Sequence, residues 1–180
     1  MGLAQSLSSI LQAARLLADM PDVQLVLIGE GVERAALEAM ASEERLNNVR
    51  FLERRPASDM SRIFALADAL LIHLKRDPLF AITIPSKTIA YLAAGRPIVA
   101  AVDGDAAEVV LRAGAGLACR AQDPIALAAC IKRLRGLPKQ VRDLMGQRGR
   151  RAFRRFYTQR VLIPQFESLL ADTCRCKEAT

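Results

Sequence analysis

The stretch that decides the fold is residues 84–102, which read IPSKTIAYLAAGRPIVAAV and predict a helix followed by a buried strand. Pro85 suits the first helical position, because the N–H that proline lacks has no partner there. Gly95 suits the left-handed position just past the helix end. Residues 98–102 are apolar without interruption, which is typical of a strand with both faces buried. The stretch therefore predicts one helix–strand unit of an α/β fold.

The first turn of this helix carries two polar side chains, Ser86 and Lys87. Unpaired backbone N–H groups and the positive end of the helix dipole face outward at such a position. A hydroxyl and an ammonium group there suit a phosphate. The alternative is that both residues merely belong to a solvated helix start, and the local sequence leaves the two interpretations open.

The rest of the chain repeats the alternation of helix and strand. Some segments carry apolar residues at helical spacing, and others are short apolar runs that end at glycine or polar residues. We expect strands over residues 23–28, 49–52, 69–74, 98–102 and 117–119. We expect helices over residues 3–19, 32–46, 58–67, 105–112 and 124–135, and two more past Pro138, the second kinked or broken at Pro164. The alternation predicts an α/β fold with a Rossmann-like, doubly wound parallel sheet and helices on both faces.

Ligands of such sheets bind beyond the carboxyl ends of the strands. Here those ends are residues 29–31, the segment after Leu52, residues 73–78 and residues 103–105, which we expect to line one crevice. Gly29 and Gly31 suit either a close approach of the backbone to a ligand or a plain structural turn. The third glycine of a dinucleotide fingerprint is missing, and the chain has no phosphate-binding P-loop.

His73 and Glu108 are further candidates near this edge. His73 ends the third predicted strand and is the only histidine, which excludes two-histidine metal sites and histidine relays. It either contacts a ligand or forms a local hydrogen bond. Glu108 follows Asp105 in a predicted helix, and either reaches the crevice or is a solvated helix charge. No metal site is expected, because the cysteines lack zinc-site spacing.

Length and composition favour one domain, since 180 residues with 52% hydrophobic content can bury a sizeable core. No run approaches the roughly 18 to 20 apolar residues of a membrane span, and the first residues do not resemble a secretory leader. We therefore expect a cytoplasmic protein. Cys119 and Cys130 are expected to be buried thiols, and Cys174 and Cys176 to lie in a polar, frayed tail.

The net charge of +7 belongs to one region. Lys132 to Arg160 contains eleven lysines or arginines and a single acid, Asp143. One interpretation is a solvated helical face whose arginines lie along the core. The other is attraction to an anionic partner, a phospholipid surface or a polyanion. The aromatic residues Phe153, Phe156 and Tyr157 are more often the apolar stripe of an amphipathic helix than a platform for bases.

Five groups of residues occur in an order and spacing that resemble a known family. They are residues 27–31, 48–52, 67–71, 85–87 with 91–99, and 108–110 with 114–116. Over most of its length the chain resembles the C-terminal, donor-binding half of a family 4 glycosyltransferase of the GT-B fold. It is most similar to bacterial enzymes that build cell-surface polysaccharide of the colanic-acid and O-antigen type, in which a Pro-Ser-Lys helix precedes Tyr-Leu-Ala-Ala-Gly-Arg-Pro.

The resemblance implies retaining transfer of a sugar from a nucleotide donor, usually linked to UDP, to a lipid-linked or saccharide acceptor. No metal and no cofactor is implied, because the nucleotide-sugar is a substrate. The donor's base would lie near the turns after the early strands, and its pyrophosphate over the start of the helix that begins with Ser86. No catalytic residue is assigned. The candidate donor-binding residues are Gly29, Gly31, Phe51, His73, Ser86, Lys87, Thr88 and Glu108.

The chain departs from the family pattern in two ways. Family members carry two glutamates eight positions apart, the second holding the ribose hydroxyls, where this chain has Ile82 and Ala90. The N-terminal acceptor domain and the first strand of the donor domain are also missing. That strand would be central in the sheet, so its loss predicts unpaired edges or pairing with another chain as a homo-oligomer.

We therefore expect a nucleotide-sugar-binding domain at residues 1–157, followed by a C-terminal helix and polar tail at 158–180. The first hypothesis is half of a glycosyltransferase for lipopolysaccharide or exopolysaccharide, inactive without its acceptor domain. The alternative is a non-catalytic interaction module that binds a partner, or the inner face of an anionic membrane, through Lys132 to Arg160. Nucleic acid is not an expected partner.

Overall fold

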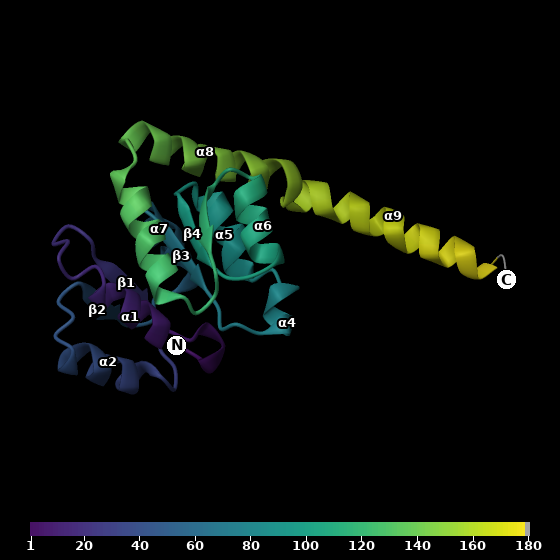
Figure 1. Cartoon of the computed structure of the whole chain (residues 1–180). Helices are drawn as coiled ribbons and strands as arrows, with labels where there is room; N and C mark the ends of the chain where they lie inside the picture. Colours follow the sequence, from purple (N-terminus) through teal and green to yellow (C-terminus); the bar gives the residue numbers. More distant parts are fainter. Residues whose placement is uncertain (179–180) are drawn as a thin grey trace.

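The computed structural model describes the backbone of residues 1–178 and all their side chains except those of Leu3, Asp172 and residues 174–178. The elements follow one another as η1 Leu3–Gln5, α1 Ser8–Arg15, β1 Leu25–Ile28, α2 Arg34–Glu43, β2 Val49–Leu52, α3 Ala57–Leu66, β3 Leu70–His73, α4 Pro78–Ala81, α5 Ser86–Ala94, β4 Ile98–Ala101, α6 Asp105–Arg112, β5 Gly116–Cys119, α7 Pro124–Gly136, α8 Lys139–Phe156 and α9 Gln159–Glu178. Strands and helices alternate through β5, as predicted, and helices flank the strands (Figure 1). The one-turn helix α4 was not expected. The prediction of one helix over residues 3–19 was too long, because the left-handed Ser6, with φ of 43°, separates η1 from α1, which ends at Arg15.

The five strands are parallel, but they form two sheets where the sequence predicted one. β1 pairs with β2, with Leu25 opposite Val49. β4 lies between β3 and β5, with Ile98 opposite both Leu70 and Gly116. Because β1 and β3 are not hydrogen-bonded to each other, the sheet is interrupted in the middle. The inner edges of β1 and β3 are therefore unpaired, as the sequence predicted.

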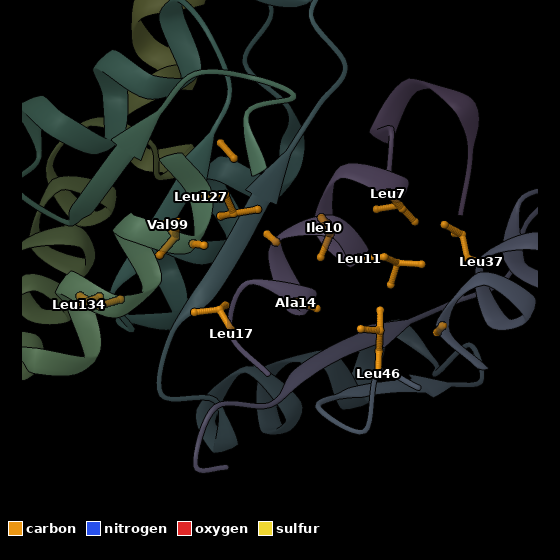
Figure 2. Packing of buried hydrophobic residues seen from close by; sticks show 14 residues of the cluster. Leu7, Ile10, Leu11, Ala14, Leu17, Leu37, Leu46, Val99, Leu127 and Leu134 are labelled. Atoms are coloured by element: carbon orange, nitrogen blue, oxygen red, sulfur yellow. The ribbon is translucent and has the colours of Figure 1, made fainter. Parts of the chain in front are cut away.

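Helix α1 holds the two sheets together through the larger of two buried clusters. Its apolar side chains pack toward β1 and α2 on one side and toward β4 and α7 on the other (Figure 2). Leu11 and Leu17 have no exposed area, and each buried leucine contributes roughly 1.5 to 3 kcal/mol. The other labelled members of the cluster are Leu7, Ile10, Ala14, Leu37, Leu46, Val99, Leu127 and Leu134. Helix α1 therefore provides the contact between the two sheets that hydrogen bonds between β1 and β3 do not.

The stretch that decided the fold forms α5 and β4 as predicted. Gly95 has φ 71°, the left-handed conformation expected at the end of a helix. Pro85 is the residue just before α5 and not its first residue, one position from the prediction. All four residues of β4 are buried, and Ile72, Leu92, Ile98 and Val110 form the second cluster, between the sheet and helices α5 and α6.

Beyond the sheets, α8 packs on α5, and α9 extends away from the body of the molecule (Figure 1). A glycine, Gly146, lets α8 approach the backbone of Gly95 closely. Of the two outcomes predicted at Pro164, the break was wrong, because α9 runs through this residue from Gln159 to Glu178, and the kink stays a prediction. The side chains of Cys174 and Cys176 lie outside the described residues. Among the described residues, no helix combines the length and the apolar character that crossing a membrane requires.

Candidate functional site

The first turn of α5 presents the polar groups that the sequence singled out. The backbone N–H groups of Ser86 and Lys87 have no acceptor among the described residues, as expected at a helix start. Lys87 is exposed, and no carboxylate in the described part of the chain pairs with it. The surrounding protein nevertheless desolvates its ammonium group and lowers its pKa. An anion at this turn would meet free N–H donors and an unpaired cation.

Thr88 lies one position further and is fully buried. Its N–H donates to the Pro85 carbonyl at 2.8 Å, but its hydroxyl oxygen has no hydrogen-bond partner in the described structure. A buried hydroxyl without a partner costs about 1 to 3 kcal/mol. Thr88 is thus the one residue of this turn whose side chain points into the protein.

His73 ends β3 and lies beside the first residues of the chain. Its Nδ1 is 2.6 Å from the carbonyl oxygen of Gln5, so Nδ1 carries the proton of the neutral ring and donates it. Nε2 is buried and has no partner among the described residues. Burial lowers the pKa of His73, although the Gln5 carbonyl partly opposes this. Both interpretations of His73 therefore survive, since one nitrogen bonds locally and the other is free.

The turn after β1 contains Gly29 and Gly31, with φ of 134° and 142°, conformations that favour glycine. A side chain on Gly31 would collide with the backbone of Met1. Arg34 reaches back to this turn and donates to the carbonyls of Gly29 at 2.9 Å and Leu52 at 3.2 Å. The guanidinium thereby ties the carboxyl ends of β1 and β2 together, a role that the sequence did not reveal.

The carboxyl ends of β3, β4 and β5 are joined by a second set of polar contacts. Arg76 Nε lies 3.8 Å from the carboxylate of Asp103, and the Arg76 N–H donates to Gln122 Oε1 at 2.7 Å. Gln122 also donates to Ser6 Oγ at 2.8 Å. Ser6 and Gln122 both have positive φ, 43° and 55°, which is uncommon for residues other than glycine. The segments predicted to share a crevice, residues 73–78 and 103–105, are therefore in contact.

Two predicted donor-binding residues lie elsewhere. Phe51 packs its side chain against the cluster around α1, because Val49 and Phe51 share the core face of β2. Glu108 is exposed and pairs with Arg112 at 2.5 Å. It lines a groove of about 510 Å³ between α6 and the end of α8, together with Ile84 and Phe156. Glu108 is thus a helix charge paired one turn along, one of the two interpretations of the sequence, and its part in donor binding stays a prediction.

The described residues contain no group of three histidine, cysteine or acidic side chains arranged to hold a metal ion. Cys119 and Cys130, predicted to be buried, are half-buried free thiols. Burial, together with the neighbouring Cys130, raises the pKa of Cys119 to about 12, so its thiol stays protonated near neutral pH.

Several arginines of the basic region hold the fold together. Arg150 donates to the carbonyls of Ala93 at 3.2 Å and Ala94 at 2.8 Å, at the end of α5. Arg142 donates in the same way to Arg135 and Leu137, at 2.9 and 3.1 Å. A cation at the negative end of a helix is favourable. Part of the positive charge thus caps helix ends, which neither interpretation of the sequence had anticipated.

Comparison with solved structures establishes the class of fold. The chain superposes on sucrose-phosphate synthase from Thermosynechococcus elongatus with a TM-score of 0.81, 20% identity, and coverage of 97% of this chain and 44% of that one. It superposes on Anabaena Alr3699/HepE, solved in complex with UDP, with a TM-score of 0.81, 19% identity, and coverage of 95% and 46%. The fold is therefore that of one half of a GT-B glycosyltransferase.

Sequence comparison identifies the family. The family described as Glycosyl transferases group 1 matches residues 3–136. The chain belongs to this family. It is also 28% identical over 132 residues to a Pseudomonas aeruginosa protein named "Probable glycosyltransferase WbjE", a match that covers 72% of this chain and 32% of the relative. The chain thus spans about a third of that relative and less than half of the solved structures.

Proposed function

We infer that this chain binds the nucleotide-sugar donor of a retaining glycosyltransferase, with the donor's diphosphate at the start of α5. The observation that carries the proposal is the combination of free N–H groups at Ser86 and Lys87 with an ammonium group that no carboxylate neutralises within the described structure. Anions bind favourably at such helix starts. The family membership and the UDP bound to Alr3699/HepE support a uridine diphosphate donor.

The remaining candidate residues fit this proposal unequally. Gly29 and Gly31 leave the backbone open after β1, and His73 offers an unpartnered Nε2 at the end of β3. These residues would line the donor site with the α5 turn. Phe51 and Glu108 contribute packing and a surface ion pair, and we do not include them.

Calorimetric titration of the 180-residue protein with UDP tests the proposal. Lys87→Ala removes one charged hydrogen bond and should weaken UDP binding by about 10- to 150-fold, equivalent to about 1.5 to 3 kcal/mol. Lys132→Ala is the matched control, because it removes the same charge from an exposed position on α7. No binding at millimolar UDP, or equal losses in both variants, would contradict the proposal.

Transfer of sugar requires an acceptor site, which we propose is supplied by a separate N-terminal domain. The resemblance to enzymes of bacterial surface polysaccharide favours an acceptor in lipopolysaccharide or exopolysaccharide synthesis. The positions of the family's two glutamates are held by Ile82, exposed just after α4, and Ala90, exposed on α5 one turn below Ser86. An alanine cannot accept hydrogen bonds from ribose hydroxyls, so we expect weaker donor binding than a glutamate at position 90 would give.

A second function, binding to an anionic membrane surface, rests on a different observation. Arg151, Arg154 and Arg155 are exposed on α8, and none pairs with a carboxylate in the described part of the chain. Each basic residue near an anionic surface contributes about 1 kcal/mol. Donor binding and membrane binding use different residues, so the two functions are compatible and can be tested separately.

A further inference from the structure

Gln122 connects two loops at the carboxyl ends of the strands, and both ends of its side-chain amide are used. Its Oε1 accepts from the Arg76 N–H at 2.7 Å, in the loop after β3. Its Nε2 donates to Ser6 Oγ at 2.8 Å, in the turn before α1. These partners are 46 and 116 residues away in the sequence. A single exposed side chain thus joins two segments that are far apart in the chain.

The backbone of Gln122 has a left-handed conformation, with φ of 55°. Its two neighbours hold it there. The Ala121 N–H donates to Asp103 Oδ1 at 3.2 Å, and Asp123 Oδ1 caps α7 by accepting from the Ala126 N–H at 2.8 Å. Glycine adopts a left-handed conformation at much lower cost than glutamine does. The turn alone therefore favours glycine at this position, and the amide contacts are what glutamine adds.

Ser6, one partner of Gln122, also has a positive φ, 43°. Left-handed residues other than glycine cost free energy, and they persist where the surrounding structure requires them, often at functional sites. Here two such residues are hydrogen-bonded to each other. Arg45, with φ of 54°, is the third residue of this kind in the described part of the chain, and it lies before β2, at the amino end of that strand. The pair of Ser6 and Gln122 is instead at the carboxyl ends of the strands, where ligands of parallel sheets bind.

The turn at Ser6 also contacts His73 at the end of β3. The carbonyl of Gln5 accepts from His73 Nδ1 at 2.6 Å, which leaves Nε2 as an acceptor in the neutral ring. Because Gln5 directly precedes Ser6, the position of Ser6 limits where this carbonyl lies. The hydrogen bond at one ring nitrogen determines which tautomer is present. Through Ser6, Gln122 therefore helps to fix the tautomer of His73.

The loop after β3 leads to the first turn of α5. It is held at Arg76 by Gln122 and by the carboxylate of Asp103, which lies 3.8 Å from Arg76 Nε. Further along, the backbone of Ala81 lies so close to Gly104 that a side chain on Gly104 would collide with it. The path of the chain from β3 to α5 is thus fixed at two points, and Gln122 contributes to the first.

We propose that Gln122 is a positioning residue of the donor site. Its amide fixes the turn at Ser6 and the loop at Arg76 relative to each other. It thereby fixes the tautomer of His73 and the path of the chain to α5. The inference rests on the donor site proposed above, but it requires no contact between Gln122 and the ligand. Because the turn itself favours glycine, loss of the amide should affect ligand binding more than stability.

Three variants, compared with the unaltered protein, separate positioning from a general loss of structure. Gln122→Gly removes the amide and suits the left-handed backbone. Gln122→Glu is the conservative variant, because its carboxylate can accept from both the Arg76 N–H and the Ser6 hydroxyl. Arg45→Gly is the matched control, since it also replaces a left-handed residue by glycine. Each protein is titrated calorimetrically with UDP and unfolded in urea, and the nitrogen chemical shifts of the His73 ring are measured at about pH 8, where the ring is neutral.

We expect Gln122→Gly to weaken UDP binding about 3- to 10-fold, and Gln122→Glu to bind UDP within about twofold of the unaltered protein. The change in urea midpoint should be no larger for Gln122→Gly than for Arg45→Gly, whose UDP binding should not change. The His73 ring should carry its proton on Nδ1 in the unaltered protein and in Gln122→Glu. In Gln122→Gly a share of the rings should carry it on Nε2.

Equal UDP affinity in Gln122→Gly and the unaltered protein would overturn the proposal. So would weaker binding that accompanies a lower urea midpoint and that Gln122→Glu does not restore, because that pattern indicates a general loss of structure. A His73 tautomer that is the same in all variants would overturn it as well, whether or not UDP binds. If the unaltered protein binds no UDP, the donor site proposed above fails, and a changed tautomer then still supports the positioning of His73 by Gln122.

Discussion

Replacement of Thr88 by valine should make the protein more stable. Thr88 is fully buried and its hydroxyl has no partner in the described structure, whereas valine has nearly the same shape without the polar group. Relief of an unsatisfied buried hydroxyl is worth about 1 to 3 kcal/mol. We therefore expect Thr88→Val to raise the free energy of unfolding by about 1 to 2 kcal/mol, because repacking offsets part of the gain.

Urea denaturation followed by circular dichroism measures this change, with Thr83→Val as the matched control. Thr83 is close in sequence but donates its hydroxyl to the Leu79 carbonyl at 2.6 Å. Its replacement should lower the free energy of unfolding by about 0.5 to 1.5 kcal/mol, so the two variants should shift in opposite directions. If Thr88→Val is destabilising by as much as Thr83→Val, the Thr88 hydroxyl has a partner and our reasoning is refuted.

Three further predictions concern other parts of the molecule. Burial lowers the pKa of His73 below its ordinary 6.5, so at a pH just below 6.5 the unfolded chain binds a proton more readily than the folded protein does. The free energy of unfolding should therefore fall as pH drops below about 6.5, by at most about 1.4 kcal/mol per pH unit. His73→Gln should remove this dependence between pH 5.5 and 7, and an unchanged slope would contradict it. Arg150→Ala should lower the free energy of unfolding, measured by urea denaturation, by about 1 kcal/mol, because its hydrogen bonds to the end of α5 are lost. Arg151→Ala is the control and should lower it much less. Equal losses in the two variants would refute the capping role of Arg150. Vesicles with anionic lipid should sediment the protein, and Arg151→Ala with Arg154→Ala should weaken this, whereas equal binding to neutral vesicles would exclude an electrostatic cause.

Local patterns in the sequence predicted most of the elements. Proline and glycine bracket α5, and the buried run that follows forms β4, because these residues restrict the backbone wherever they occur. The pairing of strands was predicted less well. A single sheet was expected from alternation alone, but β1 and β3 have no strand between them in this chain. Which strands become neighbours depends on residues far apart, and only the comparison with the family pattern predicted that the sheet would have unpaired edges.

The candidate site likewise has features that local sequence patterns predicted and features that depend on contacts between distant residues. A helix start is visible in sequence, so the exposed first turn at Ser86 and Lys87 could be predicted. The orientation of Glu108 could not, because its partner Arg112 competes with the crevice one helical turn along. The capping by Arg150 was equally hidden, since it joins α8 to the end of α5, 56 residues earlier in the chain.

The most direct test of the central claim is the mapping of UDP binding by amide chemical shifts in the 180-residue protein. The account predicts that the largest changes occur at Ser86, Lys87 and Thr88, with smaller ones at His73, and that Lys87→Ala reduces them. Changes confined to the basic residues of α8, or no changes at millimolar UDP, would contradict the assignment of the donor site to the start of α5.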